Sequence, residues 1–103
     1  KPIFVDFTGY TCTNCRWMEV NVFVDKAVEE LFENFVLIKL YTDAGPNHKQ
    51  YRQMEIDRYN TSALPFYVVL DTNENEVKRF HGMDPDISKF IKFLKLSLEE
   101  FKG

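Results

Sequence analysis

The sequence lacks a long apolar segment, a basic cluster and internal repetition. Its longest uninterrupted apolar stretch, residues 63–70, contains Pro65 and is far shorter than the about 20 apolar residues that a membrane-spanning helix needs. The formal net charge is -3 and the Lys and Arg residues form no block, which argues against nucleic acid as a partner. The chain also has no repeats and no low-complexity tract, so it is not a repeat protein.

The chain also lacks an initiator Met and a secretory signal, and it begins almost directly in a strand-like run. With 103 residues, of which 45% are hydrophobic and 28% charged, it has the composition of one soluble globular domain. We therefore expect residues 1–103 to form a single domain that has been excised from a longer chain.

Cysteine is scarce, since Cys12 and Cys15 are the only two in the sequence. A disulfide that closes so short a loop stabilises a fold by only about 2 kcal/mol in the chain-entropy model. A structural zinc site needs four ligands, and the remaining candidates, His48 and His81, lack the usual paired spacing. We interpret the pair as a reactive dithiol, with a structural bridge and a zinc-bound pair as the alternatives.

The two cysteines lie where a strand is predicted to meet a helix. The strand-like residues 2–8 precede them, and residues 16–22 contain no Gly or Pro and can continue as a helix. A thiol at that junction lies at a helix N-terminus, where free N–H groups and the helix dipole favour the thiolate, the nucleophile of disulfide exchange. Apolar residues follow Cys15 at helical spacing, so Cys15 is predicted to face inward and Cys12 to be the exposed, attacking thiol.

Asp6 is a carboxylate in the middle of an otherwise apolar strand. Burying such a group is costly unless it is neutralised or hydrogen-bonded. Two interpretations stay open at this point. Either Asp6 faces a strand edge or solvent, or it is a buried proton acceptor near the dithiol whose pKa is raised by desolvation.

Three further strands are predicted from the apolar pattern. Residues 35–41 and 66–70 have the composition of buried strands, and residues 76–81 return as an antiparallel hairpin partner. The helical stretch between the first two strands indicates a parallel βαβ unit. The predicted order is β-α-α-β-α-β-β-α, an α/β fold with helices on both faces of a mixed sheet.

Capping residues mark the starts of two of the predicted helices. Asp25 is a plausible N-cap for a second helix after the one that carries the cysteines. Asp84-Pro85 has the pattern of an N-cap and first residue for the last helix, whose apolar stripe runs from residue 87 to residue 101. Residues 49–59 form a helix of weaker periodicity between them.

These motifs together resemble thioredoxin-fold thiol:disulfide oxidoreductases, and the resemblance covers nearly the whole chain. Within that fold, the region after Cys12 is most similar to the C-terminal periplasmic domain of DsbD-type thiol:disulfide interchange proteins. The residues that carry the resemblance are Val5-Asp6-Phe7, Cys12, Cys15, Met18, Glu19, Val22-Phe23, Lys39, Asp43, Leu64-Pro65 and Gly82.

The resemblance implies a thioredoxin-like α/β domain, with a mixed central sheet flanked by helices on both faces, and a site with assigned roles. Cys12 would attack, Cys15 would resolve, and Asp6 would assist proton transfer at Cys15. Pro65 would be a cis proline facing the dithiol. The implied site comprises the catalytic residues Cys12, Cys15 and Asp6 and the substrate-binding residues Leu64, Pro65 and Tyr10.

The same resemblance implies dithiol–disulfide exchange with partner proteins, with no metal and no cofactor besides the redox-active cysteines. In a DsbD-like protein the electron donor would be a membrane-embedded domain of the same chain. The acceptors would be periplasmic thiol proteins, some of them linked with cytochrome c maturation. A general thioredoxin or disulfide isomerase and a non-catalytic thioredoxin-like binding module are the alternatives.

The sequence departs from the family pattern at three places and lacks one part of the fold. Thr11 stands where thioredoxins usually carry Trp, and Phe66 replaces a common Thr. Thr13-Asn14 matches neither thioredoxins nor strong oxidants, so it does not define a redox potential. The first strand and helix that the resemblance implies do not occur in this sequence, and we expect them to precede Lys1 in the parent chain. Without them residues 35–41 would be an exposed apolar sheet edge.

Overall fold

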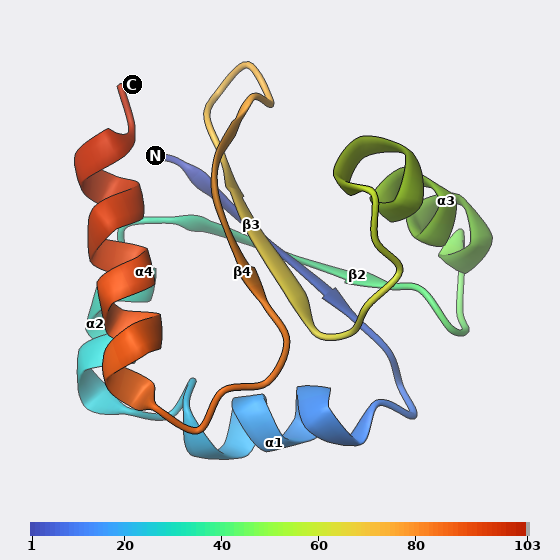
Figure 1. Ribbon diagram of the computed structural model, residues 1–103, viewed down its shortest axis with the longest axis horizontal. Coiled ribbons are helices and arrows are strands. Elements are labelled where there is room, and N and C mark those ends of the chain that lie inside the picture. Colours follow the sequence, from blue (N-terminus) through green and yellow to red (C-terminus); the bar gives the residue numbers. More distant parts are fainter. Residues whose placement is uncertain (103) are drawn as a thin grey trace.

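The computed structural model describes residues 1–102 and shows one sheet between two helical layers (Figure 1). None of the helices in this part of the chain is long and apolar enough to cross a membrane. The order of the elements confirms the predicted α/β arrangement. In chain order they are β1 (Ile3–Thr8), α1 (Thr13–Asn21), α2 (Lys26–Phe32), β2 (Val36–Tyr41), α3 (His48–Tyr59), β3 (Phe66–Leu70), β4 (Glu76–His81) and α4 (Ile87–Glu100).

The sheet has the strand order β2-β1-β3-β4, with β1 and β3 in the centre. Strand β1 is parallel to β2 and antiparallel to β3, and β3 is antiparallel to β4. In this register Val5 lies between Ile38 of β2 and Val68 of β3. The parallel β1–β2 pair, joined through α1 and α2, confirms the predicted βαβ unit.

Helices α1, α2 and α4 cover one face of the sheet and α3 covers the other. Because side chains alternate along a strand, Phe4 of β1 packs with Met18 of α1 on the first face. Phe7 points to the second face, where its ring lies 5.8 Å from that of Tyr59 in α3. Asp6 has the same parity as Phe4 and therefore faces the layer that contains the cysteine helix.

An aromatic cluster fixes the helices to the first face. The ring centroid of Phe4 lies 5.1 Å from Phe32 at the end of α2 and 6.1 Å from Phe90 in α4. Phe23, just after α1, lies 6.4 Å from Phe4 and 5.5 Å from Phe90. Such pairs add about 0.5–1.5 kcal/mol each beyond the burial of their area. The cluster therefore holds the end of α1 firmly against β1.

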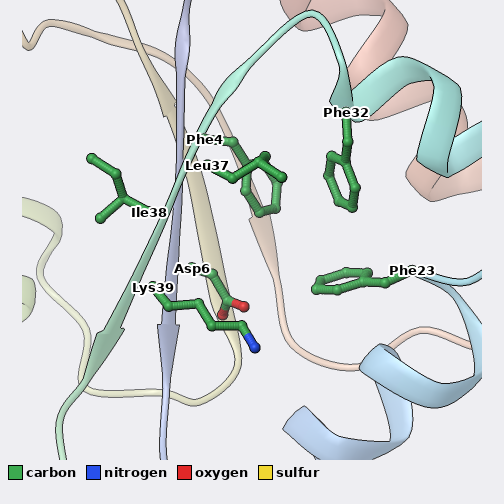
Figure 2. Close-up of a pocket in the computed structure, with 7 residues that line it drawn as sticks. All are labelled: Phe4, Asp6, Phe23, Phe32, Leu37, Ile38 and Lys39. Atoms are coloured by element: carbon green, nitrogen blue, oxygen red, sulfur yellow. The ribbon is translucent and has the colours of Figure 1, made fainter.

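Strand β2 lies at the edge of the sheet, and the prediction from its apolar pattern that it is buried is wrong: four of its six residues are exposed and the other two are half-buried. The exposed edge expected without the first strand and helix of the fold is what the structure shows. Val36, Leu37 and Ile38 are 46%, 54% and 39% exposed. An apolar pattern predicts a strand but does not say whether a neighbour covers it, and β2 pairs with β1 on one side alone within the described residues. Figure 2 shows Leu37 and Ile38 pointing to opposite faces, so apolar surface is exposed on both sides of this edge.

The predicted cap of the last helix is displaced by two residues. Asp86, not Asp84, is the N-cap of α4, and its carboxylate accepts a hydrogen bond of 3.0 Å from the Ser88 amide. Asp84 instead accepts a bond of 2.9 Å from the Asp86 amide, so Pro85 lies in the turn before the helix. The Asp25 cap of α2 is confirmed, since its carboxylate accepts bonds from the Ala27 and Val28 amides at 3.0 and 3.3 Å.

Candidate active site

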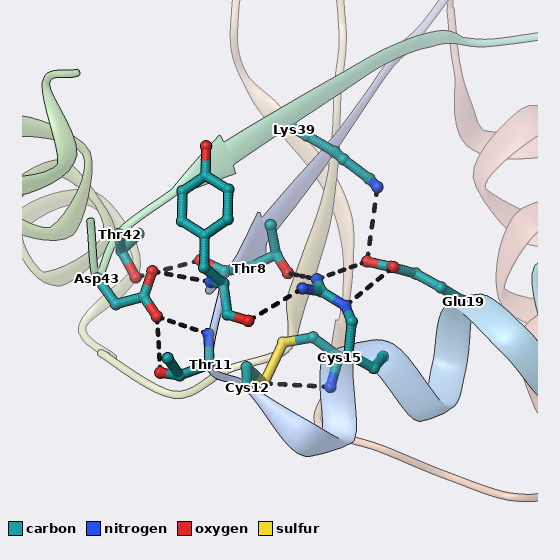
Figure 3. A network of polar contacts seen from close by, with 10 residues as sticks. Thr8, Thr11, Cys12, Cys15, Glu19, Lys39, Thr42 and Asp43 are labelled. Atoms are coloured by element: carbon teal, nitrogen blue, oxygen red, sulfur yellow. Dashed lines mark hydrogen bonds and ion pairs between the residues drawn. A yellow bond between two sulfur atoms is a disulfide. The ribbon is translucent and has the colours of Figure 1, made fainter. Parts of the chain in front are cut away.

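Cys12 and Cys15 form a disulfide at the N-terminus of α1 (Figure 3). Cys12 is the N-cap residue, with extended backbone, and its Sγ accepts a hydrogen bond of 3.1 Å from the Cys15 amide. Cys15 is 1% exposed, whereas Cys12 is half-buried. Both the predicted helix start and the inward position of Cys15 are confirmed.

This geometry favours a thiolate at Cys12 once the disulfide is reduced. The first N–H groups of a helix have no partner within the helix, and the positive end of the helix dipole lies there. The Cys15 amide already points at the Cys12 sulfur, so a negative charge on that sulfur needs no rearrangement to be stabilised. The site can therefore supply an accessible sulfur nucleophile with a second, shielded sulfur behind it.

Asp43, in the loop after β2, holds the turn that precedes Cys12. Its carboxylate accepts hydrogen bonds from the Tyr10 amide at 2.9 Å and from the Thr11 amide and hydroxyl at 3.0 and 2.9 Å. These donors lower the pKa of Asp43 to about 2. A Cβ on Gly9 would lie 2.8 Å from the Asp43 carboxylate, so the close approach requires glycine there. From the sequence, Asp43 is only a part of the family resemblance and has no predicted role; the one local signal for it is an acidic residue two positions after the end of a predicted strand.

A second polar bridge joins α1 to the sheet. Arg16 donates to the Thr8 hydroxyl at 3.0 Å and pairs with Glu19 at 2.8 Å. Glu19 also lies 3.5 Å from the Lys39 ammonium of β2 (Figure 3). Such partly exposed pairs contribute little stability, so their effect is to orient α1 over the ends of β1 and β2.

Asp6 is buried, which excludes the interpretation that it faces a strand edge or solvent. It is 4% exposed, and within residues 1–102 its Oδ1 atom has no hydrogen-bond partner. Burial raises the pKa of Asp6 to about 7, and the nearby Lys39 cation opposes that rise. In Figure 2 the side chains of Asp6 and Lys39 point to the same side of the sheet. Proton transfer between Asp6 and Cys15 stays a prediction.

The structure also places the three residues predicted to bind substrate. The Leu64–Pro65 peptide bond is cis, as predicted, and the buried Pro65 accepts a hydrogen bond of 3.0 Å from the Gly82 amide. Leu64 is half-buried beside Gly9. Tyr10 is 54% exposed, and its ring stacks on Tyr41 with centroids 4.0 Å apart. Leu64 and Tyr10 thus lie beside the turn that leads to Cys12, and their substrate contacts stay predictions.

Within residues 1–102, no group of three or more His, Cys, Asp or Glu side chains lies close enough together to hold a metal ion.

Solved structures with the same fold identify the class of this protein. A thioredoxin from Thermus thermophilus aligns with a TM-score of 0.74 at 27% identity, over 92% of this chain and 72% of the other. The reduced C-terminal domain of DsbD from Neisseria meningitidis aligns with a TM-score of 0.69 at 20% identity, over 94% and 81%. This fold with a Cys-x-x-Cys disulfide at a helix N-terminus defines the class of thiol:disulfide oxidoreductases.

The sequence comparison is consistent with that class and names the family. The thioredoxin-like family model matches residues 1–72, and the chain belongs to this family. The thiol:disulfide interchange protein DsbD of Campylobacter jejuni strain RM1221 is 27% identical over 78 residues. That match covers 76% of this chain but spans only 13% of the relative.

The raised pKa of Asp6 predicts a specific pH dependence of stability. Between its ordinary pKa of 3.8 and about 7, the folded state keeps a proton that the unfolded state has lost, so the free energy of unfolding falls as pH rises through this window. In the Asp6→Asn variant no group titrates at this position, so its free energy of unfolding does not fall through this window. At 1.36 kcal/mol per pKa unit, the variant should gain up to about 4 kcal/mol over the wild type at pH 8 and almost nothing at pH 4.

Urea unfolding of the oxidised domain at pH 4, 6 and 8 measures this gain. Glu30→Gln, on the exposed face of α2, controls for the loss of a surface carboxylate. Parallel stability curves for the wild type and Asp6→Asn would show that folding does not raise the pKa of Asp6, contrary to the burial argument.

Proposed function

We propose that this domain reduces disulfides in partner proteins through its Cys12–Cys15 dithiol. The observation that carries the proposal is the asymmetry of the pair: Cys12 is partly exposed and caps α1, while Cys15 is buried behind it. Dithiol–disulfide exchange needs one nucleophilic thiolate that a partner disulfide can reach. It also needs a second thiol that attacks only after the mixed disulfide has formed.

The first step is attack by the Cys12 thiolate on one sulfur of the partner disulfide. A Cys12–partner bond forms, the partner's sulfur–sulfur bond breaks, and the second partner sulfur leaves as a thiolate that takes a proton from water. The Cys15 amide, which donates to Cys12 Sγ, favours the attacking thiolate before this step.

The second step is attack by Cys15 on Cys12 Sγ, which releases the other partner thiol and closes the Cys12–Cys15 disulfide. Two electrons have then passed to the partner. Cys15 must lose a proton in a buried setting, and Asp6, with a pKa of about 7, is suited to accept it near neutral pH. Asp6 faces the α1 layer from β1, which supports this assignment.

The partner chain is proposed to lie along the Leu64–Pro65 segment. Leu64 contacts the turn before Cys12, so backbone at this position can pair with an extended segment of the substrate. Tyr10, exposed and stacked on Tyr41, offers an aromatic surface on the same turn. These contacts would position the substrate sulfur over Cys12.

The similarity to DsbD supports a more specific placement of the reaction. We propose that the domain receives its electrons from a membrane-embedded domain of the same longer chain and works in the periplasm, on thiol proteins that include those of cytochrome c maturation. The similarity to the Thermus thermophilus thioredoxin favours a general thioredoxin or disulfide isomerase as the second candidate. In a non-catalytic binding module, by contrast, the cysteines would be inert.

We also propose that a preceding segment of that longer chain covers the exposed edge of β2. The free edge and the exposed side chains of residues 36–38 support this, since uncovered apolar edges invite association. Amide hydrogen exchange over residues 36–41 should be at least tenfold slower in the longer chain than in this domain alone. Equal exchange rates in the two would show that the edge stays uncovered.

A resolving-cysteine variant tests the exchange mechanism. Cys15→Ser should accumulate a mixed disulfide between Cys12 and a partner protein, because attack can occur and release cannot. Non-reducing electrophoresis after incubation with an oxidised periplasmic extract should show bands that dithiothreitol removes. Cys12→Ser is the matched control and should trap nothing. Equal trapping by both variants, or by neither, would contradict the assigned order of attack.

A further inference from the structure

A polar pocket of about 610 Å³ opens between the first turns of α3 and the segment that leads to the cis proline. The residues on its wall that matter here are Asp43, His48, Lys49, Arg52, Ser62 and Leu64. Its volume is within the range of protein binding pockets and is enough for one or two side chains of a bound chain.

The pocket adjoins the turn that carries the attacking cysteine. Two of its wall residues, Asp43 and Leu64, both lie against Gly9: a Cβ there would be 2.8 Å from the Asp43 carboxylate and 3.1 Å from the Leu64 methyl. Gly9 precedes Cys12 by three residues, and its carbonyl accepts a bond of 3.3 Å from the Cys12 amide. A chain bound along Leu64 would therefore pass the mouth of the pocket.

The wall of the pocket carries uncompensated positive charge. Lys49 and Arg52 are three residues apart on α3 and so lie on neighbouring parts of one helix face. Within residues 1–102 neither belongs to an ion pair. The Lys and Arg residues that do are Arg16, Lys39, Arg58, Lys78, Arg79 and Lys89.

Two carboxyl groups lie near these cations, and neither cancels them fully. Asp43 is ionised, but its oxygens already accept hydrogen bonds from the Tyr10 and Thr11 amides and the Thr11 hydroxyl. Glu55 is fully buried on α3, and burial raises its pKa to about 8 against the opposing influence of Arg52. Glu55 is therefore mostly protonated at pH 7 and leaves the Arg52 charge free.

We propose that this pocket, the basic pocket of α3, binds an acidic side chain that lies within a few residues of the target disulfide in the partner protein. The proposal rests on the proposed function, since it names a class of substrate for the same site. The chain as a whole carries a net charge of -3, so the unpaired positive charge of Lys49 and Arg52 beside the active turn favours this place for the docking of an acidic segment. A carboxylate there would receive charge-assisted hydrogen bonds from the Arg52 guanidinium and the Lys49 ammonium.

Two disulfide-bridged peptides that differ only in flanking residues, Glu in one and Gln in the other, test the selection. At low ionic strength the reduced domain should reduce the Glu peptide about tenfold faster than the Gln peptide, as expected for steering by local charge. The Lys49→Gln/Arg52→Gln variant should bring this ratio close to one. A wild-type ratio near one, or a ratio that the double variant leaves unchanged, would overturn the proposal.

Lys92→Gln/Lys95→Gln is the matched control, because it removes the same net charge from exposed positions on α4. The control variant should keep the tenfold ratio. If it loses the ratio as the pocket variant does, the preference comes from net charge alone and the basic pocket is not the site.

A binding measurement separates this proposal from the proposed function. The Glu peptide with Ser in place of its cysteines is titrated into the oxidised domain, and amide NMR shifts should change at Lys49, Arg52 and Ser62. Reduction of the neutral hydroxyethyl disulfide reports the exchange chemistry without using the pocket. If the domain fails to reduce hydroxyethyl disulfide but the peptide still changes the amide NMR shifts, the exchange function is wrong and the acidic-segment proposal stands. Equal shifts from inorganic phosphate at matched ionic strength would assign the pocket to free anions and overturn the acidic-segment proposal.

Discussion

The hydrogen bond from the Cys15 amide to Cys12 Sγ is the interaction on which the rest of the site depends. Ser, Thr, Asp and Asn are the preferred residues at this position of a helix, and their side-chain oxygen accepts a bond from the first turn. Here a sulfur does so, and the group that starts the helix is also the proposed nucleophile. The Asp43 carboxylate fixes the turn before it, and the Arg16 bridge and the aromatic cluster fix the helix after it. The hydrogen bond from the Cys15 amide therefore both positions Cys12 and favours its thiolate.

Three carboxyl groups near the Cys12–Cys15 pair or the basic pocket have different pKa values because their surroundings differ. Asp43 is exposed and surrounded by donors, so it stays ionised and can hold backbone amides. Asp6 and Glu55 are buried with unpartnered oxygens within residues 1–102, and burial raises the pKa of each toward or above neutrality. Asp6 can consequently exchange a proton near pH 7, and Glu55 leaves its neighbouring cation unneutralised. The same carboxyl group is thus ionised at Asp43, titrates near neutral pH at Asp6 and is mostly protonated at Glu55.

Local patterns in the sequence were enough to predict the parts of the structure that depend on near neighbours. The strand before Cys12, the helix after it, the inward position of Cys15 and the cap at Asp25 all follow from residues within one or two turns. The Asp43 contacts could not be predicted in this way, because they join residues 32 and 33 positions apart. The exposure of β2 depends on what lies beside it, which an apolar pattern does not encode. At the start of α4 two aspartates flank Pro85, and both satisfy the capping pattern, so only the folded turn distinguishes them.

The most direct test of this account is the pH dependence of iodoacetamide alkylation on the reduced domain, with the labelled cysteine identified by mass spectrometry. The account predicts that Cys12 alone reacts below pH 8, with an apparent pKa clearly below the ~8.5 of a free thiol, because the first turn of α1 stabilises its thiolate. Rates no faster than those of a model peptide, or faster labelling of Cys15, would show that the helix terminus does not activate Cys12.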